Sequence, residues 1–262
     1  MRMTNHDPLP WTGERFLPTL DGNIAFEHLH RYALACLLAR DKTVLDIASG
    51  EGYGSRLLSS VAKHVTGVDI DEQSVTHATR RYPAANLVFR QGSCLEIPAD
   101  DGAVELVVCF ETIEHVDDHH AVYREFRRVL SPTGTLFISC PDKSVYSDAP
   151  GYVNPFHVHE LYLPEFVELN RAFFTHSTVM QQKIVHGSAI CPIDDADAQH
   201  CGFVGVRGNA QQMHVGSTLH SGVYNLAICS NTGKTAAIAS VFEGLGLHTD
   251  LELAFRQLQA GG

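Results

Sequence analysis

The chain has 262 residues, 44% of them hydrophobic, which suits a single globular domain with additional segments. Its 30 acidic and 19 basic residues give a formal net charge of −11, which is unfavourable for binding nucleic-acid phosphates or anionic lipid. The sequence contains no apolar run of about 18 residues and no signal-peptide pattern at its start. Its seven cysteines form no CxxC pair, so we expect a cytoplasmic protein without a disulfide framework.

The first 140 residues predict an arm followed by alternating strands and helices. Residues 1–40 are expected to form an N-terminal arm that ends in an amphipathic helix over 24–40. Beyond it, strands are expected over 43–48, 64–70, 86–91, 104–110 and 135–140, and helices over 53–62, 71–82 and 117–130. Asp71 is expected to cap the second of these helices, and "SPTG" at 131–134 to separate the third from its strand. This alternation predicts an α/β, Rossmann-like, doubly wound and mostly parallel sheet over 43–140.

The remaining residues, 141–262, are expected to complete the same domain. A long polar loop is followed by a helix over 163–174 that begins at Pro164. Two more strands, over 175–185 and 222–230, suggest an antiparallel edge and bring the sheet to about seven strands. Between them, residues 187–221 are expected to form an inserted loop or lid, and a C-terminal helix is expected at the end.

A glycine-rich segment, "VLDIASGEGYG", stands where the first strand meets its helix. Glycines at such a turn let the backbone approach a ligand at the helix N-terminus. The spacing departs from the dinucleotide pattern G-x-G-x-x-G, because the third glycine position is occupied by Ser55. Asp69 ends the second strand, 23 residues after Asp46, where a carboxylate can accept hydrogen bonds from ribose hydroxyls. A glycine-rich turn without a ligand is the alternative.

Residues 43–140 as a whole resemble the class I S-adenosylmethionine (SAM) dependent methyltransferases. The matching segments are "VLDIASGEGYG", "GVDIDEQSV", "QGSCLEIP", "VELVVCFETIEHV" and "FRRVLSPTGTLFIS". The resemblance implies SAM as the cofactor. It places the methionine part of SAM on Asp46 and the glycines, the ribose on Asp69, and the adenine beside Ile70. Ser93 stands where many members carry Asp, so the adenine contact falls to Ser93 or Cys94. The implied cofactor-binding residues are Asp46, Ala48, Gly50, Gly52, Asp69, Ile70, Ser93, Cys94 and Phe110.

The segment "FETIEHV" follows the fourth strand and carries Glu111, Glu114 and His115. In this fold the reacting centre lies beyond the carboxyl ends of the strands. If the segment turns helically, the three side chains project to one side. Three interpretations are open: solvation and capping of the next helix, a general base for which His115 is the natural candidate, or ligands of a divalent metal.

A second segment, "NPFHVHEL", favours the metal. Small-RNA terminal 2′-O-methyltransferases carry the motif E-x-x-E-H. After strand five they carry a His, followed three residues later by a Glu and six residues after that by a Phe. Those positions are here His157, Glu160 and Phe166. The resemblance implies Glu111, Glu114, His115 and His157 as ligands of Mg²⁺ or Mn²⁺, with His159 as an alternative. Glu111, His115 and His157 are then the expected catalytic residues. Ubiquinone-pathway O-methyltransferases share a similar E-x-x-E-H.

The N-terminal arm bears on the methyl acceptor. "TGERFLP…IAFEHLHRYALA" resembles bacterial methyltransferases associated with surface-polysaccharide and glycosyl biosynthesis. We therefore expect O-methylation of a sugar vicinal diol, at the end of a surface polysaccharide, with glycan-biosynthesis enzymes as partners and no nucleic acid. O-methylation of a small metabolite or natural product, and a non-catalytic SAM-binding subunit, are the alternatives. If the arm closes as a lid, Arg15, Arg31 and Tyr32 are candidates to touch SAM or substrate, whereas an exposed arginine and a core tyrosine are the commoner alternatives.

Overall fold

The computed structural model describes residues 9, 15–185, 205–208, 212–216, 221–250 and 252–253. Its main sheet has seven strands in the order β3-β2-β1-β4-β5-β9-β6. The strands are β1 (Thr43–Ile47), β2 (His64–Asp69), β3 (Leu87–Gln91), β4 (Val104–Phe110), β5 (Leu130–Pro141), β6 (His176–Gln182) and β9 (Tyr224–Ser230). β1 to β5 are parallel, whereas β9 runs antiparallel to both β5 and β6. The predicted doubly wound sheet with an antiparallel edge is confirmed.

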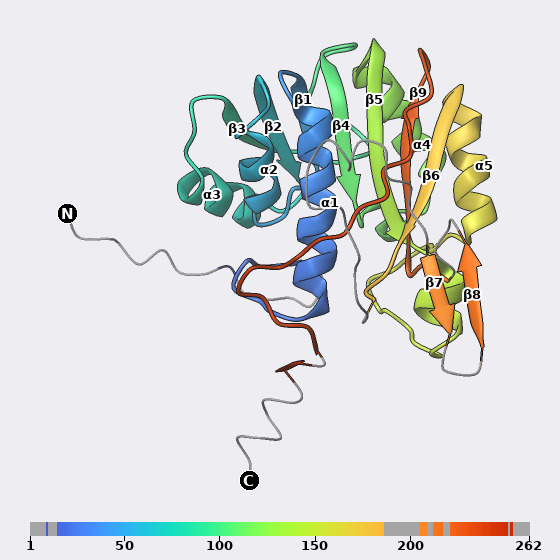
Figure 1. Ribbon diagram of the computed structural model, residues 1–262. Helices are drawn as coiled ribbons and strands as arrows, with labels where there is room; N and C mark the ends of the chain where they lie inside the picture. Colours follow the sequence, from blue (N-terminus) through green and yellow to red (C-terminus); the bar gives the residue numbers. More distant parts are fainter. Residues whose placement is uncertain are drawn as a thin grey trace, which may run out of the picture.

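Helices cover both faces of the sheet (Figure 1). They are α1 (Asn23–Ala39), α2 (Tyr53–Leu58), α3 (Glu72–Arg81), α4 (His119–Val129) and α5 (Leu163–Phe173), with a 3₁₀ turn over Ile113–His115 and a π-helical turn over Ser144–Asp148. Two hydrophobic clusters fill the space between these layers. Along β4, Val107 and Cys109 face the cluster under α4 and α5, whereas Leu106 and Val108 face the one under α1 and α2. Since successive strand residues point to opposite faces, continuous apolar strands bury both faces and leave only their ends for chemistry.

Local capping chemistry sets the helix starts. The Asp71 carboxylate accepts from the backbone N–H groups of Gln73 and Ser74 at 3.2 Å each, so the predicted cap of α3 is confirmed. The Asp118 carboxylate accepts from Ala121 N at 2.8 Å and begins α4. At α5, Glu165 accepts from the Tyr162 backbone N–H, and proline stands in the first turn as expected.

Two element boundaries predicted from sequence are wrong. α2 ends at Leu58 rather than near residue 62, because the Ser59 and Ser60 hydroxyls bond back to the carbonyls of Arg56 and Leu57. β5 begins at Leu130, directly after α4, and runs through the "SPTG" segment that was expected to separate the helix from a strand over 135–140. Leu130 has an extended backbone and pairs with Val104 of β4, which draws the chain into the sheet early.

The predicted insertion over 187–221 contains a two-stranded antiparallel hairpin, β7 (Gly205–Gly208) and β8 (Met213–Gly216). Most other residues of this segment lie outside the described part of the chain, and the predicted C-terminal helix lies largely outside it too. None of the described helices combines the length and apolarity that crossing a membrane requires.

After β9 the chain returns across α1 in an extended conformation (Figure 1). The Phe242 ring packs edge-on against Phe26 of α1, with 6.2 Å between centroids, and the His30 ring bonds Ser240 Oγ at 2.8 Å. At the start of α1, Gly22 N donates to the carbonyl of His248 at 2.8 Å. The C-terminal segment therefore fastens α1 to the domain.

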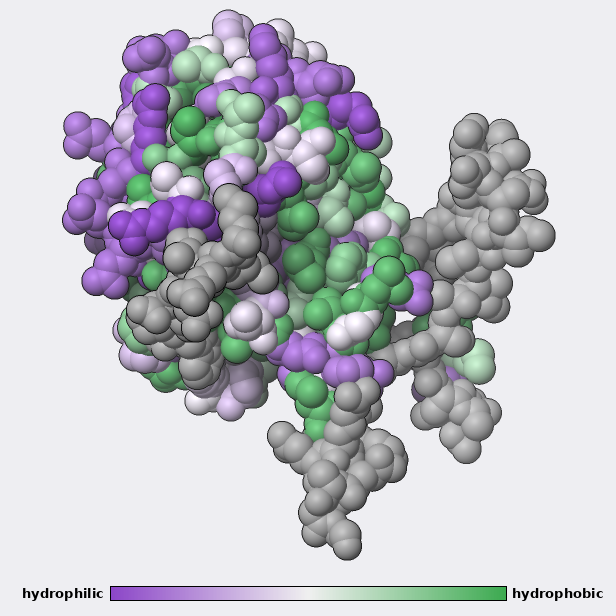
Figure 2. Space-filling view, turned by 90° about the vertical axis from the view of Figure 1, so that its left-hand side faces the viewer, coloured by the Kyte–Doolittle hydropathy of each residue, from purple (hydrophilic) through white to green (hydrophobic). Residues whose placement is uncertain are grey.

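Hydrophobic side chains gather right of centre on the side of the molecule drawn in Figure 2, and hydrophilic side chains are concentrated on its left.

Candidate active site

Asp46, at the end of β1, is buried beneath the glycine-rich turn. Its carboxylate accepts hydrogen bonds from Ser55 Oγ at 2.6 Å and from the Tyr32 hydroxyl at 3.1 Å. Burial raises the pKa of Asp46 from 3.8 to about 7, against the lowering effect of these two hydrogen bonds. The carboxyl group thus ties α1 and α2 to the first strand.

This pKa shift predicts a pH dependence of stability. An acid that ionises near pH 7 when folded and near 3.8 when unfolded binds more protons in the folded state. Its contribution to stability is therefore complete below roughly pH 4 and is lost as the pH rises through about 7. We expect the SAM-free protein to lose up to about 1.4 kcal/mol per pH unit in this window relative to the Asp46→Asn variant. Urea unfolding at several pH values measures this difference, and parallel pH profiles for the two proteins would contradict it.

The turn after Asp46 is shaped to approach a ligand. Ala48 and Gly50 both have left-handed backbones, with φ of 58° and 55°, and a Cβ built on Gly50 would meet nothing within 4 Å. Gly52, at φ 94°, is required for packing, since a Cβ there would lie 2.6 Å from the side chain of Ala78. The Ser49 hydroxyl is buried without a hydrogen-bond partner among the described residues. Open space beside Gly50 and an unsatisfied polar atom beside it fit a bound polar ligand.

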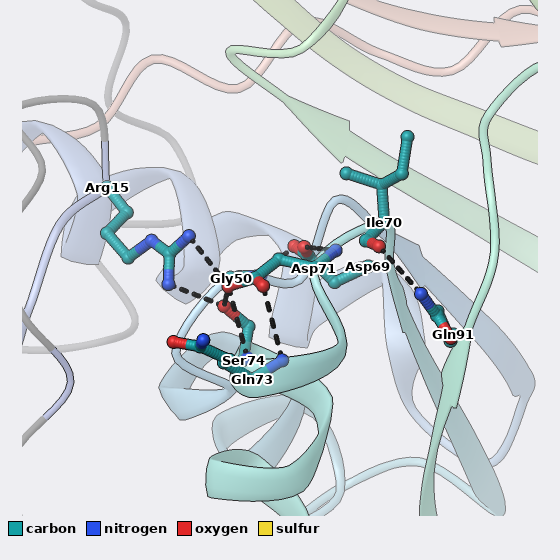
Figure 3. Close-up of polar contacts among 8 residues, drawn as sticks. All are labelled: Arg15, Gly50, Asp69, Ile70, Asp71, Gln73, Ser74 and Gln91. Atoms are coloured by element: carbon teal, nitrogen blue, oxygen red, sulfur yellow. Dashed lines mark hydrogen bonds and ion pairs between the residues drawn. The ribbon is translucent and has the colours of Figure 1, made fainter.

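Asp69, at the end of β2, braces the same turn (Figure 3). Its Oδ2 accepts from Gly50 N at 2.7 Å and its Oδ1 from Asp71 N at 2.9 Å. Each carboxylate oxygen keeps a further lone pair for a ligand. The Ile70 side chain points away from this polar group and is 73% exposed, although its carbonyl is held by Gln91 Nε2 at 3.1 Å. An exposed apolar side chain beside the carboxylate predicted to bind the ribose fits the predicted adenine contact.

The other predicted cofactor residues have different surroundings. Ser93 Oγ accepts from Leu95 N at 3.1 Å and so closes a local turn, and Cys94 packs partly against the core. The Phe110 ring lies edge-on to Tyr32 and Phe137, at 5.2 and 5.0 Å between centroids, and is buried. These three stay predicted contacts, and Phe110 also belongs to the core.

The N-terminal arm reaches this region through Arg15. Its guanidinium donates to Ser74 Oγ at 2.5 Å and to Asp71 Oδ2 at 3.1 Å, at the start of α3 (Figure 3). The neighbouring Phe16 is buried against His28 and Tyr53. Arg15 therefore fastens the arm beside Asp69 rather than leaving it in solution.

At the end of β4, Glu111 leaves the strand with a left-handed backbone, φ 48°. Its Oε1 accepts from Ser139 Oγ at 2.5 Å and lies 3.3 Å from Nη1 of the buried Arg31. A helical turn over "FETIEHV" was the condition for all three side chains to project to one side, and it is not met at Glu111, because the 3₁₀ turn begins only at Ile113. Glu111 is held by α1 and β5 and does not belong to the cluster of possible metal ligands that the described residues form, although its charge still acts on Glu114.

Glu114, His115 and His157 come together as predicted. One ligand atom from each lies within 4.8 Å of the others, a separation that a single cation can bridge. Glu114 is fully buried, and its Oε2 has no hydrogen-bond partner among the described residues. Burial, followed by the nearby charge of Glu111, raises the pKa of Glu114 well above its ordinary value. A buried carboxylate oxygen without a partner fits a site for a cation.

The two histidines are oriented by their other ring nitrogens. His115 Nδ1 lies 3.0 Å from the carbonyl of Phe156, and His157 Nδ1 lies 2.5 Å from Glu160 Oε1. Donation of both Nδ1 protons leaves each Nε2 as the metal-binding atom. Asn154 Nδ2 stands 3.0 Å from His157 Nε2, so a cation must displace this amide. His159, the alternative ligand, stacks instead on His119 with 4.5 Å between ring centroids.

Comparisons with known proteins identify the family. Residues 45–138 match the family model described as a methyltransferase domain. A probable S-adenosylmethionine-dependent methyltransferase of Mycolicibacterium smegmatis is 36% identical over 203 residues, 75% of each chain. The chain belongs to the class I SAM-dependent methyltransferases. The predicted family and fold are therefore confirmed, and SAM is the cofactor expected of such a methyltransferase.

More distant similarities extend to other members. A ubiquinone biosynthesis O-methyltransferase of Idiomarina loihiensis is 32% identical over 120 residues, 45% of this chain and 49% of that one. The crystal structure of YcgJ from Bacillus subtilis superposes with a TM-score of 0.57 at 19% identity, and covers 79% of this chain and 100% of that one. The latter is a likeness of fold.

Sequence reasoning missed several partners in the site of this methyltransferase. Arg31 was weighed as a contact of SAM or substrate against an exposed surface arginine, yet it is buried, binds Glu111 and Gln182, and lies over the Tyr224 ring at 4.8 Å. The sequence offered one signal of this buried position, because Arg31 and Tyr32 stand in an otherwise apolar stripe of the predicted helix. Asn154 gave no signal beyond its place in "NPFH".

Proposed function

We propose that this methyltransferase transfers the methyl group of SAM to a hydroxyl held beside Glu114, His115 and His157. Asp46, Asp69 and the turn at Gly50 support SAM at the ends of β1 and β2. The three-residue cluster stands at the end of β4, where the methyl group of a SAM bound in this way would point. The observation that carries the proposal is the unpartnered, buried Oε2 of Glu114 among two imidazoles.

We further propose that these three residues bind a divalent cation. When bound, such a cation lowers the pKa of the acceptor hydroxyl and orients it. Three protein ligands leave open positions for two neighbouring hydroxyls, which suits a vicinal diol. Two imidazoles with one carboxylate favour Mn²⁺ over Mg²⁺, because Mg²⁺ prefers oxygen ligands. This set is smaller than the predicted four, because Glu111 is held by Arg31 and Ser139.

Glu111 has a separate role in this proposal. Its Oε1 is fixed by Ser139 and Arg31, which leaves Oε2 to accept the proton of the acceptor hydroxyl. His115 is the alternative base if no cation binds. His157, oriented by Glu160, holds the acceptor side of the cluster.

For the acceptor we propose a sugar with vicinal hydroxyls at the end of a bacterial surface polysaccharide. The methyltransferase would then act together with glycan-biosynthesis enzymes. The net charge of −11 supports a glycan or small molecule over nucleic acid. The similarity to a ubiquinone biosynthesis O-methyltransferase supports a phenolic diol as the second candidate. The free cysteines at 36, 94, 109, 140 and 229 support the cytoplasm as the compartment.

Chelation tests this function. Removal of divalent ions with EDTA is expected to reduce methyl transfer from labelled SAM at least about 100-fold, because the acceptor hydroxyl loses its activating charge. Mn²⁺ is expected to restore activity more fully than Mg²⁺, and SAM affinity, measured by calorimetry, should stay within about threefold. Methyl glycosides and catechol serve as parallel acceptors. Full activity in EDTA would remove the cation and leave His115 as a metal-free base.

A further inference from the structure

The loop after the π-helical turn exposes apolar side chains beside the proposed cation site. Tyr152, Val153, Phe156 and Val158 are 49%, 82%, 49% and 64% exposed, and together they are called the apolar rim. Four such residues within a seven-residue stretch leave an unusual amount of apolar surface in contact with water. Exposed apolar surface of this kind is typical of a binding surface.

The backbone of this loop is bonded to the cluster itself. The Phe156 carbonyl lies 3.0 Å from His115 Nδ1, and Val158 N donates to the Glu114 carbonyl at 2.8 Å. The main chain at Phe156 and Val158 thus faces the cluster while their side chains are exposed. An occupant of the rim would directly adjoin a hydroxyl held by Glu114 and His115.

Aromatic rings continue the path from the cluster to the rim. The His157 ring stacks on Tyr146 with 5.4 Å between centroids and 23° between planes. Tyr146 in turn meets Tyr152 edge-on at 5.8 Å. A continuous series of aromatic rings therefore links a proposed cation ligand to the apolar rim.

Charge narrows the choice of occupant. The loop over residues 149–162 contains no lysine or arginine, and the whole chain carries a net charge of −11. Surfaces that dock on anionic membranes or on acidic partners present basic residues around their apolar side chains. A neutral hydrocarbon chain that is part of the acceptor needs no such residues.

We propose that the apolar rim binds a hydrocarbon chain carried by the acceptor next to the hydroxyl that is methylated. The acceptor is then amphipathic, with a polar diol at Glu114, His115 and His157 and an apolar chain across Tyr152, Val153, Phe156 and Val158. This inference rests on the proposed function, whose reaction centre it extends.

Alkyl glucosides of increasing chain length test the proposal. Methyl, propyl and hexyl β-D-glucopyranosides, below their micelle concentrations, are titrated into the full chain with Mn²⁺ and S-adenosylhomocysteine present. A chain that lies on a surface buries about half of each methylene, so affinity is expected to rise about twofold per methylene. From methyl to hexyl the gain is then about 30-fold.

Matched variants locate the effect. The double variant Val153→Ser with Phe156→Ser is expected to reduce the gain from methyl to hexyl below about threefold. Its affinities for S-adenosylhomocysteine and Mn²⁺ should be unchanged, because neither side chain is among the proposed ligands of the cation or of the cofactor. Leu37→Ser, on α1 and 62% exposed, removes a comparable apolar group elsewhere and should retain the full gain.

Three results would overturn the proposal. The first is that the hexyl glucoside binds no more tightly than the methyl glucoside, or that neither binds measurably, in protein that binds S-adenosylhomocysteine and Mn²⁺. The second is cosedimentation with phosphatidylcholine vesicles that the double variant loses, which would assign the rim to a membrane surface. The third is a dimer, seen by light scattering, that the double variant dissociates. Loss of Mn²⁺ binding or of methyl transfer would instead contradict the proposed function.

Discussion

Replacing Asp69 with alanine is expected to weaken SAM binding at least about 100-fold. The carboxylate holds Gly50 N and Asp71 N, and in the proposed cofactor site its remaining lone pairs accept from the ribose hydroxyls. Hydrogen bonds to a charged group contribute about 1.5–3 kcal/mol each, so losing two of them costs about 3 kcal/mol or more. Isothermal titration calorimetry with SAM measures the change. Asp69→Asn, which keeps one acceptor oxygen, should lie between the wild type and the alanine variant.

Asp71→Ala provides the matched control for this prediction. Asp71 is two residues away and accepts from Gln73 N, Ser74 N and Arg15, but it faces the helix start and the arm. Its loss is expected to lower stability by about 1 kcal/mol, as for other N-caps, with little change in SAM affinity. Equal affinity losses in both variants would show that α3 as a whole, rather than the Asp69 carboxylate, supports the cofactor.

Glu114→Gln is expected to abolish divalent-cation binding and methyl transfer while leaving the cation-free protein as stable as the wild type, or more stable. A buried carboxylate oxygen without a partner disfavours the folded state when it is ionised, and the amide removes that charge. A bound cation reverses the balance, because it compensates the charge. Thermal unfolding with and without Mn²⁺ should therefore show an increase in Tm for the wild type and none for the variant.

A second buried glutamate supplies the comparison. Glu51 is also buried, but its carboxylate accepts from the Tyr82 hydroxyl at 2.7 Å and lies 2.9 Å from His77 Nε2. Glu51→Gln should lower stability, since satisfied hydrogen bonds are weakened, and should leave Mn²⁺ affinity unchanged. A destabilised Glu114→Gln variant that still binds Mn²⁺ would contradict the cation site.

The features that the sequence predicts are those set by local pattern or by strand ends. The position of Asp71 before a helical pattern is enough to predict that it caps the helix. Parallel strands bring Asp46 and Asp69 to the same edge of the sheet. The return of His157 toward Glu114 follows from the loop after the fifth strand. The left-handed backbone of Glu111 has no such signal, because nothing in "FETIEHV" distinguishes it from a helical turn.

Long-range side-chain pairing was the harder part. Arg31 lies on α1 and Glu111 follows β4, so the two meet only through the packing of α1 on the sheet. The hydrogen bond of Asn154 to His157 depends on a loop conformation that has no periodic pattern. Such contacts follow from tertiary packing, which the local patterns of a single sequence do not predict.

The left-handed residues at the ends of the two central strands have a consequence for engineering. Ala48 and Glu111 each accept a backbone conformation that costs a non-glycine residue about 1–2 kcal/mol. The protein thus loses stability at the edge of the sheet where we propose that the reaction takes place, and the two hydrophobic cores offset this loss. A more thermostable version would begin at Ala48, where glycine removes strain without removing a functional group. The strain at Glu111 would have to stay, because the carboxylate that it positions cannot be supplied by glycine.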